Sequence, residues 1–187
     1  RVAIYKPWAA SMDEGWTRWV LEQYGFEPKT LDNKAIRAGK LAESFDAIVL
    51  PDVEKEVIAK GKPKRDEEEM QYFAELPPEY AGGLDKEGAK ALKDFVEAGG
   101  TLIAFDSACD YVLEEFNIPV RNTLAKASSE EFSIAGSLLK VRVVPDHPAT
   151  YGLPEEVAIF VNDKVAFQTA LGGAELDRWV LASYPDA

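Results

Sequence analysis

Short apolar runs of strand length alternate with stretches of helical spacing along the first half of the chain. The clearest runs cover residues 2–5, 26–31, 45–50 and 101–105. Stretches with apolar residues three and four positions apart lie between them, which is the spacing of one helix face. This order of strand, helix and strand is typical of a parallel sheet covered by helices. We therefore predict an α/β fold with a mostly parallel sheet and helices on both of its faces.

The first helix has a well-defined predicted start. Ser11 and Glu14 have the spacing of a capping box, in which each side chain can satisfy backbone amides of the first turn. Large apolar residues then recur at helical spacing as far as Gly25, and such residues are usually buried. We expect a helix to about residue 24 with a core-facing stripe made of Trp16, Trp19, Val20 and Tyr24.

The segment 53–83 interrupts this rhythm. A basic block over residues 60–65 precedes an acidic block over 66–69, and proline and glycine are frequent from 76 to 83. Blocks of like charge usually lie in solvent. The segment is therefore predicted to be a charged insertion with a short helix near 67–73. Asp85 is predicted to cap the helix that follows, and Gly99 to end it.

Length and composition favour one globular domain over residues 1–187, because 187 residues with 47% hydrophobic content can bury a core. The chain starts at Arg1 immediately before a strand and stops soon after the run 178–184, so we expect a domain excised from a longer polypeptide. The net charge of −12 disfavours nucleic acid and membrane surfaces as partners. A single cysteine excludes an internal disulfide and a multi-cysteine metal site.

The strongest candidate for chemistry is the corner after the run 101–105. Chemistry in open α/β sheets lies past the carboxyl ends of the strands, and a nucleophile elbow is a turn between a strand and a helix. Ser107 and Cys109 both lie at this corner. The alternatives are a serine that caps the helix and a cysteine that is a small buried residue. The carboxylates of Asp106 and Asp110 would raise the thiol pKa by like-charge repulsion.

Two further groups of residues are candidates. His147 is the only histidine, and it can be a base or simply a loop residue before Pro148. Without a cluster of histidine or cysteine around it, we expect no metal site. Four carboxylates and one aromatic residue could converge at the strand ends and hold a ligand, a cation or an amine, or could instead be capping and solvated groups. These five residues are Trp8, Asp13, Glu14, Asp52 and Asp106.

Several segments in order resemble the class I glutamine amidotransferase-like fold. These are FDAIVLPD at 45–52, the stretch from 84 to 107 that ends in GGTLIAFDS, and DHPATYGLP at 146–154. The stretches 6–26 and 77–84, together with the elbow, are similar to the amidotransferase-like domain that accompanies bacterial zinc carboxypeptidases of the carboxypeptidase A type. The resemblance implies a flavodoxin-like three-layer sandwich over nearly the whole chain.

The resemblance also bears on catalysis. Enzymes of the fold use a cysteine at the elbow and a histidine followed two residues later by glutamate. The matching corner residue is predicted to be Ser107, and His147 is followed by proline and alanine, so the pattern is absent. The resemblance therefore implies a non-catalytic accessory domain that serves domain packing or substrate recruitment. Its partner would be the peptidase domain of the same polypeptide, with zinc only in that domain, and export would follow if the parent is secreted.

Two alternative functions stay open from the sequence. A divergent hydrolase or amidase would use Ser107 or Cys109 at the elbow. A small-molecule or peptide-binding module would instead use the crevice between Trp8, Asp13, Asp52 and the elbow.

Overall fold

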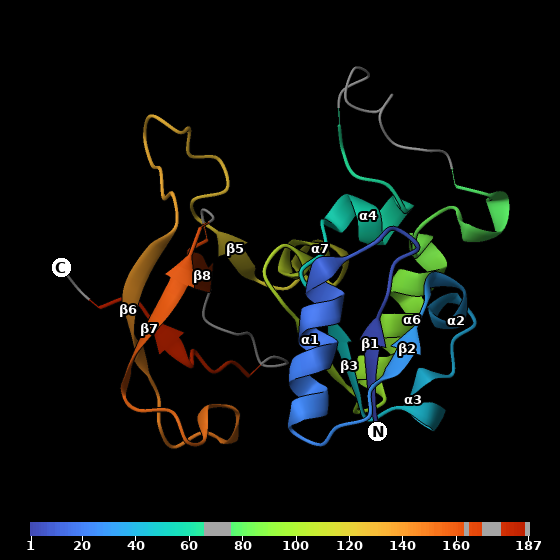
Figure 1. The fold of residues 1–187 in the computed structure, drawn as a ribbon, viewed down its shortest axis with the longest axis horizontal. Coiled ribbons are helices and arrows are strands. Elements are labelled where there is room, and N and C mark those ends of the chain that lie inside the picture. Colours follow the sequence, from blue (N-terminus) through green and yellow to red (C-terminus); the bar gives the residue numbers. More distant parts are fainter. Residues whose placement is uncertain (66–75, 163–164, 170–176, 186–187) are drawn as a thin grey trace. The chain divides into compact units, whose positions relative to one another are not determined.

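A computed structural model of the chain describes residues 1–65, 76–162, 165–169 and 177–185 (Figure 1). The chain divides into two compact units, Arg1–Ile118 and Pro119–Ala187, and each is treated by itself. The single domain expected over 1–187 stays a prediction. The short helix expected near 67–73 lies outside the described residues.

The first unit is built on a parallel sheet of four strands, as the apolar runs predict (Figure 1). The strands pair in the order β2-β1-β3-β4, and every neighbouring pair is parallel. Because all strands point the same way, the segments that follow them start at the same edge of the sheet. The strands are β1 (Val2–Tyr5), β2 (Lys29–Leu31), β3 (Ala47–Leu50) and β4 (Thr101–Ala104).

Helices cover both faces of this sheet, which confirms the predicted α/β class. Among the described residues, one face packs against five helices, whose buried residues form a single hydrophobic cluster with alternate residues of the strands. The segment predicted as a solvated insertion contributes α4 to this cluster, since Val57 and Ile58 of that helix are buried. The five helices are α2 (Asn33–Arg37), α3 (Leu41–Ser44), α4 (Lys55–Lys60), α6 (Asp85–Glu97) and α7 (Ala108–Glu115).

Helix α1 (Met12–Gln23) covers the other face. The side of the helix that faces the sheet is opposite to the side that the sequence predicts. Its start is confirmed, because the Ser11 hydroxyl accepts a hydrogen bond from the Glu14 amide. The predicted core stripe is wrong: Trp16 is 65% exposed and Trp19 53%. The side that faces the sheet carries Glu14, which is 5% exposed and pairs with Arg18.

Arg18 explains why the helix turns this side inward. Its guanidinium donates to Glu14 Oε1 at 2.6 Å, to the Pro28 carbonyl at 2.9 Å and to Thr30 Oγ1 at 3.0 Å. These bonds fasten α1 to the segment that enters β2. A charged side chain with three acceptors is better satisfied here than in an apolar core. Trp16 and Trp19 lie on the opposite side of the helix and face away from the sheet.

Exposure across this face of the sheet rises toward the edge strand. Ile4, Val49 and Ile103 are opposite one another in the register of β1, β3 and β4. Their exposed fractions are 0%, 3% and 37%. Helix α1 thus covers the middle of the sheet and leaves β4 uncovered on this side, where Phe105 is also 45% exposed.

The described part of the second unit contains two small antiparallel sheets. One pairs β5 (Val120–Asn122) with β8 (Phe167–Thr169). The other has β6 (Ser137–Val143) between β7 (Glu156–Val161) and β9 (Ala182–Ser183). The strand predicted over 178–184 is therefore only two residues long. None of the helices in the described ranges is long and apolar enough to span a bilayer.

Candidate functional site

The corner between β4 and α7 has the backbone of a strained elbow. Asp106 has a φ angle of 43°, a left-handed conformation that costs a residue with a side chain on the order of 1 kcal/mol. The amide of Cys109 donates to the Asp106 carbonyl at 2.9 Å, which closes the turn into the helix. The strained corner residue is therefore Asp106, one position before the Ser107 that the sequence predicts.

Ser107 occupies the N-cap position of α7, but its hydroxyl makes no capping hydrogen bond. Its φ of −59° and ψ of −27° are already helical, whereas a side-chain cap needs an extended backbone. The interpretation of Ser107 as a capping side chain is wrong for this reason. The cap comes instead from Asp52, whose Oδ1 accepts a hydrogen bond from the Ser107 amide at 3.1 Å.

Cys109 is held as a protonated thiol. Its sulfur donates to the Ala104 carbonyl at 3.3 Å, back across the turn into β4. Burial raises the pKa of the thiol to about 11, and the carboxylates of Asp106, Asp110 and Asp52 contribute to this rise. A nucleophilic cysteine needs the opposite surroundings, with cationic neighbours that lower the pKa.

His147 belongs to the second unit and has a local structural role. It is the N-cap of η2 (Pro148–Thr150), where its Nδ1 accepts a hydrogen bond from the Ala149 amide at 3.1 Å. Its ring lies 5.6 Å from the Trp179 ring, tilted by 43°. Both contacts are those of an ordered loop histidine, which is the alternative that Pro148 favours.

The predicted crevice residues are only partly brought together. Trp8, Asp52 and Asp106 follow β1, β3 and β4, so the sheet places them at one edge. Trp8 packs edge-on against Tyr80, with ring centroids 5.0 Å apart. Asp13 lies exposed in the first turn of α1. Within the described ranges, no three His, Cys, Asp or Glu side chains are grouped to hold a metal ion.

Glu14 is also a candidate for this crevice, but its carboxylate accepts two bonds from Arg18 beneath α1. A carboxylate committed in this way is a structural group of the helix. A basic residue four positions after a glutamate on a helix predicts an ion pair, so the pairing of Glu14 with Arg18 could have been predicted from the sequence.

Tyr111 is a residue that no sequence pattern singles out. It is 2% exposed, and its hydroxyl has no hydrogen-bond partner among the described residues. It adjoins a small groove of about 170 Å³ between α4 and α7, across which Lys55 and Glu114 form an ion pair at 2.7 Å. A tyrosine on an apolar helix stripe looks like any other core residue, so only the tertiary contacts reveal this unpaired group.

The chain aligns with two solved structures. A glutamine amidotransferase from Thermotoga maritima aligns with a TM-score of 0.51 and 14% sequence identity, over 90% of this chain and 62% of its own. A Thermoplasma acidophilum protein, described as a component of GMP synthase, aligns with a TM-score of 0.46 and 17% identity, over 87% of this chain and 64% of its own. The chain therefore spans less than two thirds of both structures.

These likenesses concern the fold. The parallel sheet with its two helix layers, together with the likeness to the Thermotoga maritima structure, defines this chain as a protein of class I glutamine amidotransferase-like fold. No protein-family model matches the sequence, and no curated protein matches it.

Proposed function

We propose that this chain is a non-catalytic, amidotransferase-like accessory module of a zinc carboxypeptidase, and that it packs against the peptidase domain of the same polypeptide. The carboxypeptidase context rests on the resemblance of the stretches 6–26 and 77–84 and of the elbow to such accessory domains. Zinc would belong to the peptidase domain.

The observation that carries the non-catalytic role is the chemistry of the elbow. The strained position holds the carboxylate of Asp106, and burial together with the nearby carboxylates disfavours the anion of the Cys109 thiol. An amidotransferase-type reaction needs a thiolate or an activated hydroxyl with an adjacent base. The only histidine is engaged with the Ala149 amide of its own loop.

The packing role is supported by the apolar stripe of α1, defined as Met12, Trp16, Trp19, Val20 and Tyr24. These residues recur at helical spacing and are between 46% and 80% exposed. Trp16 and Trp19 also form an edge-to-face pair with ring centroids 6.1 Å apart. A contiguous apolar patch rich in tryptophan is typical of a protein interface.

The first test is the reading frame upstream of Arg1, which should encode a metallopeptidase domain with histidine and glutamate zinc ligands. That domain, produced separately, should bind the 1–187 chain in calorimetry. Binding should weaken by about tenfold or more in the double variant W16S/W19S, since interface tryptophans often contribute more than about 1.4 kcal/mol each.

The matched control is L138S/F160S in the second unit. Leu138 and Phe160 are directly opposite each other in β6 and β7 and are 75% and 68% exposed, but they lie outside the α1 stripe. Equal weakening by both double variants would refute the assigned surface. A start codon immediately before Arg1 would refute the accessory role, and release of ammonia from glutamine by the 1–187 chain would refute the non-catalytic role.

A further inference from the structure

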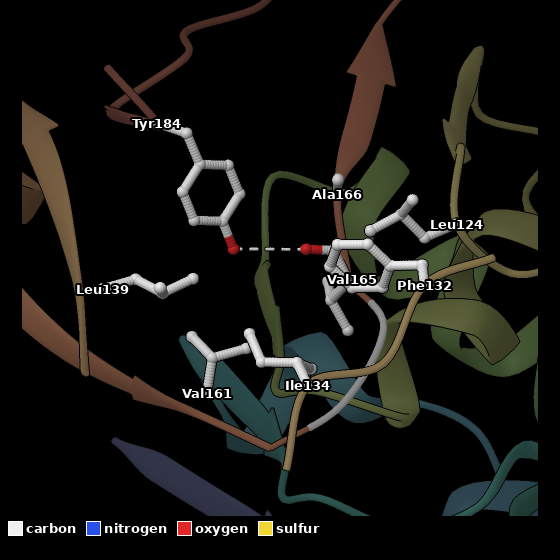
Figure 2. Close-up of a pocket in the computed structure, with 8 residues that line it drawn as sticks. All are labelled: Leu124, Phe132, Ile134, Leu139, Val161, Val165, Ala166 and Tyr184. Carbon is white, nitrogen blue, oxygen red and sulfur yellow. Dashed lines mark hydrogen bonds between the residues drawn. The ribbon is translucent and has the colours of Figure 1, made fainter. Parts of the chain in front are cut away.

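The second unit contains an apolar pocket that the proposed function does not use. Its cavity volume is about 230 Å³ (Figure 2). The strands β6 and β7 contribute Leu139 and Val161, and the loop before β6 contributes Phe132 and Ile134. All of these residues lie in the unit Pro119–Ala187, so the pocket is complete within one part of the chain.

The pocket continues the inner face of the antiparallel sheet. On β6, Val141 and Val143 are buried, while the intervening Arg142 is exposed. Leu139 lies on the same face two residues earlier, but it borders empty space and is only half-buried. The hydrophobic core of this unit therefore ends in a cavity.

Several polar groups of the wall form hydrogen bonds within the second unit. The Tyr184 hydroxyl donates to the Val165 carbonyl at 3.2 Å (Figure 2). The Ala166 carbonyl accepts from the Thr123 amide at 2.8 Å, and the Ala166 amide donates to Asn122 Oδ1 at 3.1 Å. The lining side chains are hydrocarbon apart from the Tyr184 hydroxyl, so a charged or strongly polar ligand would lose its hydration without gaining a partner.

Size and shape narrow the ligand class further. An apolar cavity of about 150 Å³ stays dry and binds benzene, so 230 Å³ has room for a substituted ring. Phe132 and Tyr184 are 36% and 44% exposed, so they border both the pocket and solvent. Aromatic walls favour an aromatic guest in edge or offset contact.

We propose that this pocket binds an uncharged small molecule that carries an aromatic ring of the size of a substituted benzene. Burial of apolar surface drives the binding. The pocket is formed by residues of the second unit, whereas the elbow and the α1 stripe belong to the first unit, so this proposal can be tested independently of the function proposed above.

The test is titration of the 1–187 chain with toluene, cyclohexane and phenylacetate, followed by the thermal midpoint and by NMR. Toluene should raise the midpoint and give nuclear Overhauser effects to the methyl groups of Leu124 and Val161, which line the pocket. Phenylacetate, with its charge, should have no effect. Cyclohexane should bind more weakly than toluene, and tighter binding of cyclohexane would refute the preference for an aromatic ring.

A filling variant provides the second test. Ala166→Phe places a ring in the pocket and should weaken toluene binding by about tenfold or more. The control Ala158→Phe adds the same ring on the exposed face of β7 and should leave binding unchanged. Equal loss in both variants, or no toluene contacts to Leu124 and Val161 in the unmodified protein, would overturn the proposal. The toluene contacts to Leu124 and Val161 in the unmodified protein test the proposal even if Ala166→Phe does not fold.

Discussion

Asp52 Oδ1 accepts a hydrogen bond from the Ser107 amide at 3.1 Å, so a residue that follows β3 caps the helix that follows β4. The two residues are 55 positions apart in the chain. The bond fixes the elbow to the neighbouring strand end, and it supplies the negative group that the start of a helix favours.

Removal of this cap should destabilise the fold. Asp52→Ala is expected to lower the free energy of unfolding by about 1 kcal/mol, the usual loss when a capping acceptor is removed. Urea unfolding followed by circular dichroism measures it. Asp52→Asn keeps an acceptor oxygen and should lose less than half as much. An unchanged stability in Asp52→Ala would mean that water replaces the cap without cost.

Two buried tyrosines should respond in opposite ways to loss of the hydroxyl. Tyr5 donates to Asn33 Oδ1 at 2.7 Å, while the Tyr111 hydroxyl has no partner among the described residues. Tyr5→Phe leaves an acceptor unpaired and should cost about 1–2 kcal/mol, whereas Tyr111→Phe should be neutral or stabilise by up to about 1 kcal/mol. Guanidinium unfolding of both variants decides this. A loss of stability in Tyr111→Phe equal to that in Tyr5→Phe would indicate a water-mediated partner.

The thiol of Cys109 should react slowly. Its pKa is raised from 9.0 to about 11, so at pH 8 the thiolate fraction is lower than that of a free thiol by about a hundredfold. Labelling with a disulfide reagent should be slower by at least this factor than in the variant C109A/S129C, whose thiol lies on an exposed loop. Similar rates for the two proteins would contradict the assigned environment.

The raised pKa of the Cys109 thiol also makes the stability of the protein depend on pH. The folded protein holds the thiol proton more tightly than the unfolded chain does. The contribution of the protonated thiol to the free energy of unfolding is therefore complete below about pH 9 and is lost as pH rises through about 11. Unfolding experiments between pH 8 and 11 should therefore show a steeper decline in the wild type than in Cys109→Ala.

We expect the loss of one partner of the Glu14–Arg18 ion pair to lower the free energy of unfolding more than the replacement of both partners. Arg18→Ala leaves Glu14, which is 5% exposed, without its partner, and should cost roughly 2–4 kcal/mol. The double variant E14L/R18M removes both charges and should recover at least half of that loss. Thermal unfolding at two salt concentrations measures both effects. If the double variant is no more stable than Arg18→Ala, the bonds of Arg18 to Pro28 and Thr30 dominate.

Much of the first unit could be predicted from the apolar pattern. The runs at 2–5 and 101–105 both contain strands of the sheet, as predicted. The continuously apolar run 2–5 forms β1, which is covered on both faces, whereas β4 keeps one face exposed at Ile103. Ser11 caps the first helix as its spacing indicates, although the Glu14 carboxylate pairs with Arg18. These are local rules, and they depend on residues close together in the chain.

The orientation of α1 could not be predicted in the same way. Helical spacing shows that Trp16 and Trp19 share a face, but it does not say which face meets the sheet. Glu14 and Arg18 form a second face, and the contacts of Arg18 with Pro28 and Thr30 turn that one inward.

The sequence by itself determined the strands of the first unit, their parallel sheet and the position of the elbow between β4 and α7. Only the tertiary structure decided that the strained residue is Asp106 and that Asp52, rather than Ser107, caps the helix. The physical reason is that a left-handed φ and a bond across 55 residues depend on how neighbouring strands end together. No local pattern of apolar and polar positions contains that information.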